Sequence, residues 1–335
     1  MGWFYFLAAA VGQMIVSLTG ATYIGNAFHI SQWETAGLAC FILLIAGISN
    51  HFGIRISGRV SLSLSSILLI LLLIVVVSTL PLMEWANFRP FLPHGWPSVG
   101  TALTLVFWSF FGWEAICNLA DRFRQPDRDL VRSSMISAFI IGILFLLLSL
   151  VTIGSGTYGS LTTDASPLGE MIHRSLGFEA RRITALLAFI ICTGTTNAFV
   201  ASLGQLGYAL SRDGAFPRSL QKTHPKRGTA ARVIWLVILF AGSGVLGTTL
   251  LRVHFTQLLF IPNALGMMVY FLSMAAACKL FPVKSGPWVG GGASLLLLCL
   301  SLPFLGLQLL IPAGVCVTYF FYVQWRKYIG EVGGV

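Results

Sequence analysis

Residues 133–154 read SSMISAFIIGILFLLLSLVTIG, a run that contains no charged side chain. An α-helix needs about 20 consecutive apolar residues to cross the hydrocarbon core of a bilayer, so this run predicts a transmembrane helix. Comparable runs recur along the chain. The ten expected spans are residues 3–24, 34–52, 60–81, 99–117, 133–154, 183–209, 231–250, 256–278, 287–304 and 307–325. The last two are joined by residues 303–308, which predict either a tight turn or part of one bent hairpin.

The overall composition leads to the same fold class. Hydrophobic residues make up 56% of the 335 positions and charged residues 10%, and the mean hydropathy is +0.84. A water-soluble globule with a polar surface is excluded by these values. No connection between the spans is long enough to fold as a soluble domain. We therefore expect an all-α membrane protein in which residues 1–335 form a single transmembrane domain.

The basic residues predict an orientation in the membrane. If the ten spans alternate, five of the 21 Lys and Arg residues fall on one side, namely Arg89, Arg174, Arg181, Arg182 and Arg252. The other sixteen fall on the opposite side, which the positive-inside rule assigns to the cytoplasm together with both termini. Because the net charge of +10 is distributed in this way, it indicates a lipid bilayer as partner and argues against nucleic acid.

Two outward connections differ in character. Residues 81–97 carry four prolines with Trp85 and Trp96, and residues 155–182 are more polar and rich in glycine. Prolines and tryptophans at a membrane boundary are typical of an interfacial loop, and a gate element is the alternative.

Motifs for enzymatic chemistry are absent from the sequence. We find no Walker motif, no GxSxG, no HExxH and no pair of catalytic carboxylates. The six cysteines stand singly in or beside apolar runs, and the six histidines are scattered among the connections. We therefore expect neither an enzyme nor a metal site, and no cofactor.

The fourth span holds the most informative acidic residue. Glu114 lies within residues 107–115, FWSFFGWEA, and the other ten of the eleven acidic residues lie in loops or at the ends of spans. A carboxylate in a bilayer normally faces a cavity or a partner. Gly112, flanked by aromatic residues, is a position at which the helix can break and expose backbone carbonyls to a cavity. The alternative is that Glu114 pairs with Arg122 and anchors the helix end.

Two further spans carry polar groups. The sixth contains Thr195 and Thr196, whose hydroxyls are suited either to an ion or substrate site or to structural hydrogen bonds between helices. The eighth contains Pro262 followed by Asn263, where the missing proline donor frees a backbone carbonyl and permits a hinge.

Several motifs together resemble a known family. Residues 107–114 (FWSFFGWE) followed by 124–128 (RQPDR) resemble the sixth-helix signature and the next loop of the amino acid, polyamine and organocation (APC) superfamily of permeases. Residues 208–217 (YALSRDGAFP) are similar to the loop after that family's eighth helix. Residues 263–270 and 274–280 resemble the tenth-helix region of its L-methionine and branched-chain amino acid exporters.

The resemblance implies a five-plus-five inverted repeat with broken helices that hold the amino acid at mid-membrane. It implies that Trp108 covers the substrate, that the carbonyls around Ser109 to Gly112 accept from its ammonium group, and that Glu114 serves the cytoplasmic gate and the proton pathway. The family's sodium site would use Thr195 or Thr196. The substrate-binding residues expected on this basis are Trp108, Ser109, Phe110, Phe111, Gly112 and Asn263.

The same alignment of motifs makes the first span correspond to the family's third helix. We therefore expect an incomplete repeat, family helices 3 to 12, without the first broken helix that holds the substrate carboxylate. Arg122, where relatives usually carry an acid, and Val131, where they often carry proline, also depart from the pattern.

The resulting functional hypothesis is a secondary transporter. It would move a neutral, apolar amino acid such as methionine or a branched-chain one, in the efflux direction, by alternating access across the inner membrane with proton or exchange coupling. The alternatives are a membrane receptor or assembly subunit that does not transport, and a truncated permease without function. The sequence does not define the oligomeric state.

Overall fold

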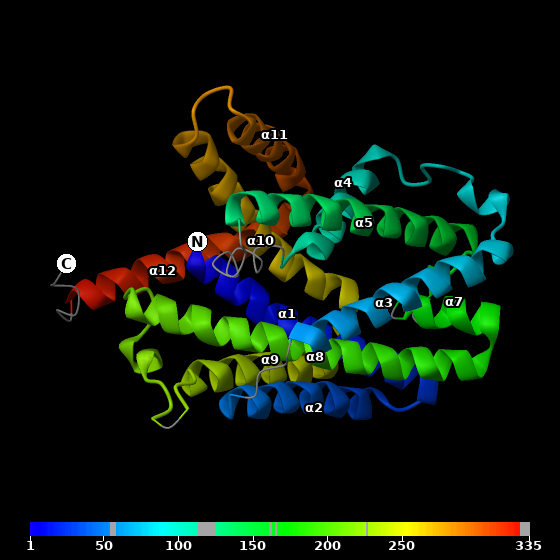
Figure 1. Cartoon of the computed structure of the whole chain (residues 1–335), viewed down its shortest axis with the longest axis horizontal. Helices are drawn as coiled ribbons and strands as arrows, with labels where there is room; N and C mark the ends of the chain where they lie inside the picture. Colours follow the sequence, from blue (N-terminus) through cyan, green and yellow to red (C-terminus); the bar gives the residue numbers. More distant parts are fainter. Residues whose placement is uncertain (54–57, 113–124, 161–162, 165, 226, 329–335) are drawn as a thin grey trace.

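The computed structural model describes residues 1–53, 58–112, 125–160, 163–164, 166–225 and 227–328, and its regular structure in these ranges is helical throughout (Figure 1). The α-helices are α1 (Gly2–Phe28), α2 (Gln32–His51), α3 (Gly58–Thr79), α4 (Trp96–Val106), α5 (Pro126–Gly154), α7 (Pro167–Leu176), α8 (Phe178–Arg212), α9 (Ala231–Leu251), α10 (Phe255–Leu280), α11 (Gly286–Ser301) and α12 (Leu310–Tyr328). The 3₁₀ turns are η1 (Leu80–Leu82), η2 (Trp85–Phe88), η3 (Phe107–Phe110), η5 (Arg218–Gln221) and η6 (Leu302–Leu309).

The centre of the molecule is a group of four helices, α1, α2, α8 and α9, which contact one another (Figure 1). Helices α1 and α8 run antiparallel, because Gly2 lies against Leu210 while Gly20 lies against Cys192. Glycine permits this close approach, and small residues at helix contacts are typical of membrane bundles. Helices α2 and α9 each pack on both α1 and α8.

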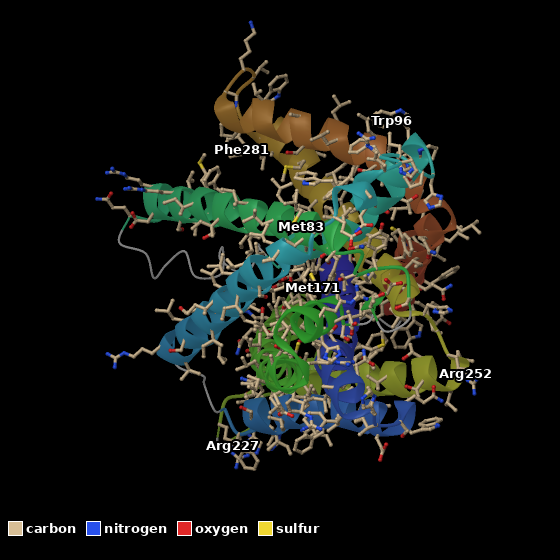
Figure 2. All side chains as sticks on the ribbon, turned by 90° about the vertical axis from the view of Figure 1, so that its right-hand side faces the viewer. Met83, Trp96, Met171, Arg227, Arg252 and Phe281 are labelled. Carbon is tan, nitrogen blue, oxygen red and sulfur yellow. The ribbon has the colours of Figure 1, made fainter. Side chains whose placement is uncertain are left out.

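A second group is built from α3, α5 and α7. Met83 and Met171, both labelled in Figure 2, belong to its apolar cluster, in which Val75 of α3 and Val151 of α5 are fully buried. The connection before α4 is attached to this group, because the backbone N–H of Glu84 and the side-chain amide of Asn87 both donate to the carbonyl of Gly154. The short helix α7 lies within residues 155–182, a connection that the sequence had marked only as polar and rich in glycine.

The third group is α4, α10, α11 and α12, with α10 in contact with all three others and with α1. The indole of Trp3 at the start of α1 packs against Tyr319 and Tyr322 near the end of α12, at centroid distances of 5.5 and 5.6 Å. The beginning of α1 and the end of α12 therefore lie at the same end of the bundle, as an even number of spans requires.

Each of the ten expected spans corresponds to helical structure. Among the described residues, eight segments are long and apolar enough to cross a membrane. Two features explain why this number is lower than the ten expected spans. Helix α4 has 11 residues before it breaks, and residues 286–325 count as one segment. Within that segment Gly306 adopts φ 53° and ψ −128°, which is not helical. The connection at 303–308 is thus a turn between two helices.

Candidate functional site

The fourth span is interrupted where the sequence places Gly112. Helix α4 ends at Val106, residues 107–110 form the 3₁₀ turn η3, and Phe111 is extended with φ −76° and ψ 129°. Gly112 follows with φ +114°, a conformation that favours glycine because a Cβ atom would be strained there. A helix break leaves carbonyl groups without intrahelical donors. The described helical structure of the fourth span therefore ends at Phe110, just before Gly112, and residues 113–124 lie outside the described residues. We call residues 107–112 the broken segment.

The rings of the broken segment stack against α1. Trp108 and Phe111 are nearly parallel, with centroids 5.7 Å apart and an interplanar angle of 12°. Tyr5 of α1 stacks on Phe111 at 5.5 Å. The indole of Trp108 lies over Gly12 of α1, where a Cβ atom would be 2.6 Å from the ring. Because Gly12 lacks a side chain, Trp108 can sit directly against the α1 backbone.

Helix α10 holds the opposite side of the broken segment. The Asn263 side-chain amide donates to the carbonyl of Thr104 at 2.8 Å and to that of Leu105 at 3.4 Å. The Tyr270 hydroxyl donates to the carbonyl of Phe110 at 3.2 Å. Side chains from α10 thus satisfy carbonyls on both sides of the point where α4 ends.

Helix α8 approaches the break through Phe199, whose ring lies 3.0 Å from the position a Gly112 Cβ would take. Thr195 and Thr196 are one helical turn before Phe199, so all three lie on neighbouring parts of the α8 surface. Thr196 is fully buried, and Thr195 is half-buried. The two threonines therefore lie one helical turn from Phe199, the α8 residue that approaches the broken segment.

Several buried side-chain oxygens lack a hydrogen-bond partner among the residues that the structure describes, Thr79 Oγ1 on α3 included, and three of them lie on helices that contact the broken segment. The three are Gln13 Oε1 on α1, Thr196 Oγ1 on α8 and Asn263 Oδ1 on α10. These three helices contact the broken segment, and α5 does so as well through Phe145, whose ring lies edge-on to Phe110. A buried acceptor without a donor costs about 1–3 kcal/mol, so such groups usually mark a place where water, an ion or a ligand binds.

The expected site residues differ in exposure. Trp108, Phe111 and Gly112 are half-buried, and Ser109 and Phe110 are exposed. Asn263 is completely buried, so a ligand reaches it only when α4 and α10 separate. Glu114 lies outside the described residues.

Sequence reasoning did not assign roles to Gly12, Gly266 and Tyr270. A signal for the last two exists, because Asn263, Gly266 and Tyr270 follow the i, i+3, i+7 spacing of one helix face.

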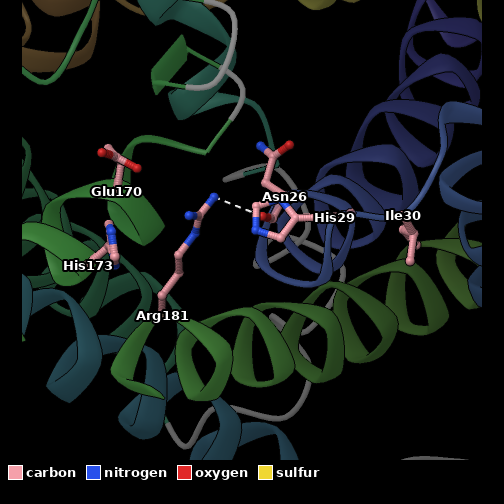
Figure 3. A pocket seen from close by; sticks show the side chains of 7 residues that line it. Asn26, His29, Ile30, Glu170, His173 and Arg181 are labelled. Atoms are coloured by element: carbon pink, nitrogen blue, oxygen red, sulfur yellow. Dashed lines mark hydrogen bonds between the residues drawn. The ribbon is translucent and has the colours of Figure 1, made fainter. Parts of the chain in front are cut away.

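A separate cavity of about 480 Å³ lies at the far end of α1 from Trp3, and Figure 3 shows its lining. Its polar groups are bonded to the surrounding elements. Arg181 donates to the carbonyl of Asn26 at 2.8 Å, the Asn26 amide donates to the Ser166 hydroxyl at 2.7 Å, and Glu170 forms an ion pair with Arg174 at 3.2 Å. We interpret this cavity as the place where α1, α7 and α8 are joined.

The described interior is mainly apolar, and the polar side chains buried in it are uncharged. Its buried polar side chains are Gln, Ser, Thr and Asn, and no Asp, Glu, Lys, Arg or His is buried in the described ranges. Helices α2 and α8 are linked directly by the buried pair Asn50 and Asn197, in which the Asn50 amide donates to Asn197 Oδ1 at 2.9 Å. The same amide donates to the backbone carbonyl of Asn197 at 3.0 Å.

A bundle of long apolar helices, with irregular backbone in one span, is the architecture of a polytopic membrane protein. The amino acid permease family model matches residues 1–325. The chain therefore belongs to the amino acid permease family, within the APC superfamily, and it is not an enzyme.

Relatives support this assignment. The "uncharacterized amino acid permease YecA" of Bacillus subtilis (strain 168) is 31% identical over 327 residues, which cover 97% of this chain and 77% of the relative. The L-methionine/branched-chain amino acid exporter YjeH of Escherichia coli (strain K12) is 24% identical over 83% of this chain and 66% of its own length. The branched-chain amino acid permease BcaP of B. subtilis (strain 168) is 29% identical over 55% of this chain and 40% of its own.

Proposed function

We propose that this protein is a secondary transporter of neutral, apolar amino acids, with methionine and the branched-chain amino acids as substrates and efflux as the direction. The observation that carries the proposal is the broken segment between α1 and α10. Its irregular backbone lies in a span that is otherwise apolar, where such backbone is tolerated only if it is buried in protein or lines a cavity.

The proposed binding mode follows from the chemistry of the segment. A zwitterionic amino acid needs acceptors for its ammonium group, and the carbonyls of residues 109–112 with Asn263 Oδ1 supply them. The face of Trp108 also attracts a cation. The aromatic rings of Trp108 and Phe111 provide an apolar surface for the substrate side chain. We propose Thr195 and Thr196 as a second polar site, for an ion.

The substrate class is supported by the absence of buried charge in the described interior. A cationic or anionic side chain transferred from water into a helical bundle requires a charged partner. The described interior offers amides and hydroxyls only. The names of two relatives, an L-methionine/branched-chain amino acid exporter and a branched-chain amino acid permease, agree with a neutral substrate.

Proton coupling is assigned to Glu114, because the other acidic residues lie in loops or at the ends of spans. In this proposal the protein crosses the inner membrane several times with both termini in the cytoplasm, as the distribution of basic residues favours. The chain spans 77% and 66% of the two relatives that it matches over most of its length.

The test is counterflow of radiolabelled methionine and leucine into proteoliposomes, with arginine and putrescine as charged competitors. The chain is assayed as printed and with any coding sequence upstream of Met1 restored. We expect methionine and leucine to exchange and the charged compounds not to compete. Trp108→Leu should abolish exchange, whereas the matched control Trp85→Leu, at a loop tryptophan that is 81% exposed, should retain it. Binding of methionine without exchange in either form would instead indicate a receptor.

A further inference from the structure

Three residues on one face of α10 contact the broken segment at successive points. Asn263 donates to the carbonyls at the end of α4. Gly266 faces Phe111, whose ring would be 2.6 Å from an added Cβ. Tyr270 donates to the carbonyl of Phe110 and packs edge-on against Phe107 at a centroid distance of 5.3 Å. The spacing i, i+3, i+7 places all three on the same side of the helix.

These contacts replace hydrogen bonds that α4 loses when it breaks. The last carbonyls of a helix have no intrahelical donor and need an external one. Asn263 supplies it before the break, and Tyr270 supplies it at the last residue of η3. The Phe111 N–H donates to the carbonyl of Trp108 at 3.1 Å. The orientation of the carbonyls on both sides of the break is therefore fixed largely from α10.

Asn263 lies directly after the proline that weakens α10. Pro262 is inside the helix and has no N–H, so the carbonyl four residues earlier loses its backbone donor. Bends in helices occur at such positions. The bonds to the end of α4 and to the broken segment come from Asn263 and Tyr270, which both follow Pro262 in the chain. A bend of α10 at Pro262 moves these two donors together.

We propose that Asn263 and Tyr270 form a latch that makes the broken segment move with the part of α10 beyond Pro262. In this arrangement both are positioning residues: Asn263 holds the end of α4, Tyr270 holds the carbonyl of Phe110, and together they keep the broken segment in the geometry that receives the substrate ammonium group. The substrate role of those carbonyls rests on the function proposed above. The latch itself is a mechanical connection, and it can be tested without any substrate.

The first test measures hydrogen–deuterium exchange of the peptide covering residues 104–111 in the purified full chain. Tyr270→Phe removes one hydroxyl and leaves the ring. Loss of one hydrogen bond that holds a segment closed should speed local exchange about two- to tenfold. The matched control is Ser273→Ala, which removes an α10 hydroxyl bonded only to the carbonyl of Val269 in its own helix.

Asn263→Leu should accelerate exchange in the same peptide more strongly, because it removes donors from two carbonyls. Exchange in α9 should be unchanged in both variants, which separates loss of the latch from general unfolding. Equal exchange at residues 104–111 in Tyr270→Phe and Ser273→Ala would overturn the proposal.

The second test is methionine counterflow with the same variants. The latch predicts that Tyr270→Phe raises KM about two- to tenfold while kcat changes less, since carbonyls that are not held bind the ammonium group less well. A normal KM would show that Tyr270 does not position the substrate site.

The two tests also separate the two proposals. Faster exchange in Tyr270→Phe together with no amino acid counterflow in the parent protein would support the latch and reject the transport function. Amino acid counterflow in the parent protein, together with unchanged hydrogen–deuterium exchange in Tyr270→Phe, would support the transport function and reject the latch.

Discussion

Replacement of Gly266 by alanine tests the packing of the broken segment against α10. The new Cβ would lie 2.6 Å from Cε2 and 2.8 Å from Cδ2 of Phe111. The ring cannot simply rotate away, because it is stacked between Tyr5, at 5.5 Å, and Trp108, at 5.7 Å. The substitution must therefore displace Phe111, and with it the broken segment.

The magnitude follows from two opposing terms. Alanine in place of glycine stabilises a helix interior by about 0.5–1 kcal/mol. Overpacking of a filled site costs about 1–3 kcal/mol. The control Gly242→Ala in α9 should show the helix stabilisation without the overpacking cost, since a Cβ there meets no atom within 4 Å among the described residues. We therefore expect Gly266→Ala to be less stable than Gly242→Ala by about 1–3 kcal/mol.

The assay is reversible unfolding by SDS titration in mixed micelles, with methionine counterflow measured on the same preparations. Gly266→Ala should also raise the KM for methionine, and Gly242→Ala should not. If the two variants are equally stable, Phe111 does not occupy the space beside Gly266 and the described packing is incorrect.

Three other predictions concern single contacts. Asn50→Leu should lower the free energy of unfolding by about 1–3 kcal/mol, because buried acceptors on Asn197 lose their donor; an unchanged SDS midpoint would contradict the α2–α8 link. Ser31→Ala removes the N-cap of α2 and should cost about 0.5–2 kcal/mol in the same titration, whereas Ser31→Asp, which restores a cap, should recover most of it. Glu114→Gln should leave the protein in the membrane but make methionine flux independent of pH, and a retained pH profile would remove Glu114 from the coupling step.

The sequence was sufficient to predict most of the spans. A transmembrane helix is specified by the local length of its apolar run, which is why residues 231–250 were expected and Ala231–Leu251 was found. The end of the described helical structure just before Gly112 was also predictable, since glycine among aromatic residues in a span with a carboxylate is a local pattern. Helix α7 was missed because it is short and amphipathic, and its apolar side is buried by segments distant in the sequence, α3 and α8 among them.

The surroundings of the site depend on contacts between distant segments. Gly12 receives Trp108 only because α1 passes beside the fourth span, and nothing near Gly12 in the sequence indicates an aromatic partner. The Tyr270 hydroxyl likewise finds the carbonyl of Phe110 across 160 positions of the chain. Asn263 was expected to bind substrate, whereas its amide donors are committed to α4 and only its oxygen is left as an acceptor. The substrate roles of Trp108, Ser109, Phe110, Phe111, Gly112 and Asn263 stay predictions.

The most direct test of the central claim is substrate protection of a thiol placed in the broken segment. Ser109 is exposed, so the cysteine in Ser109→Cys should react with a maleimide, and its modification can be followed by mass spectrometry separately from the native cysteines. If the broken segment binds the amino acid, saturating methionine should slow modification at position 109 while arginine leaves it unchanged. Equal modification rates with and without methionine, in protein that still exchanges methionine, would place the substrate site elsewhere.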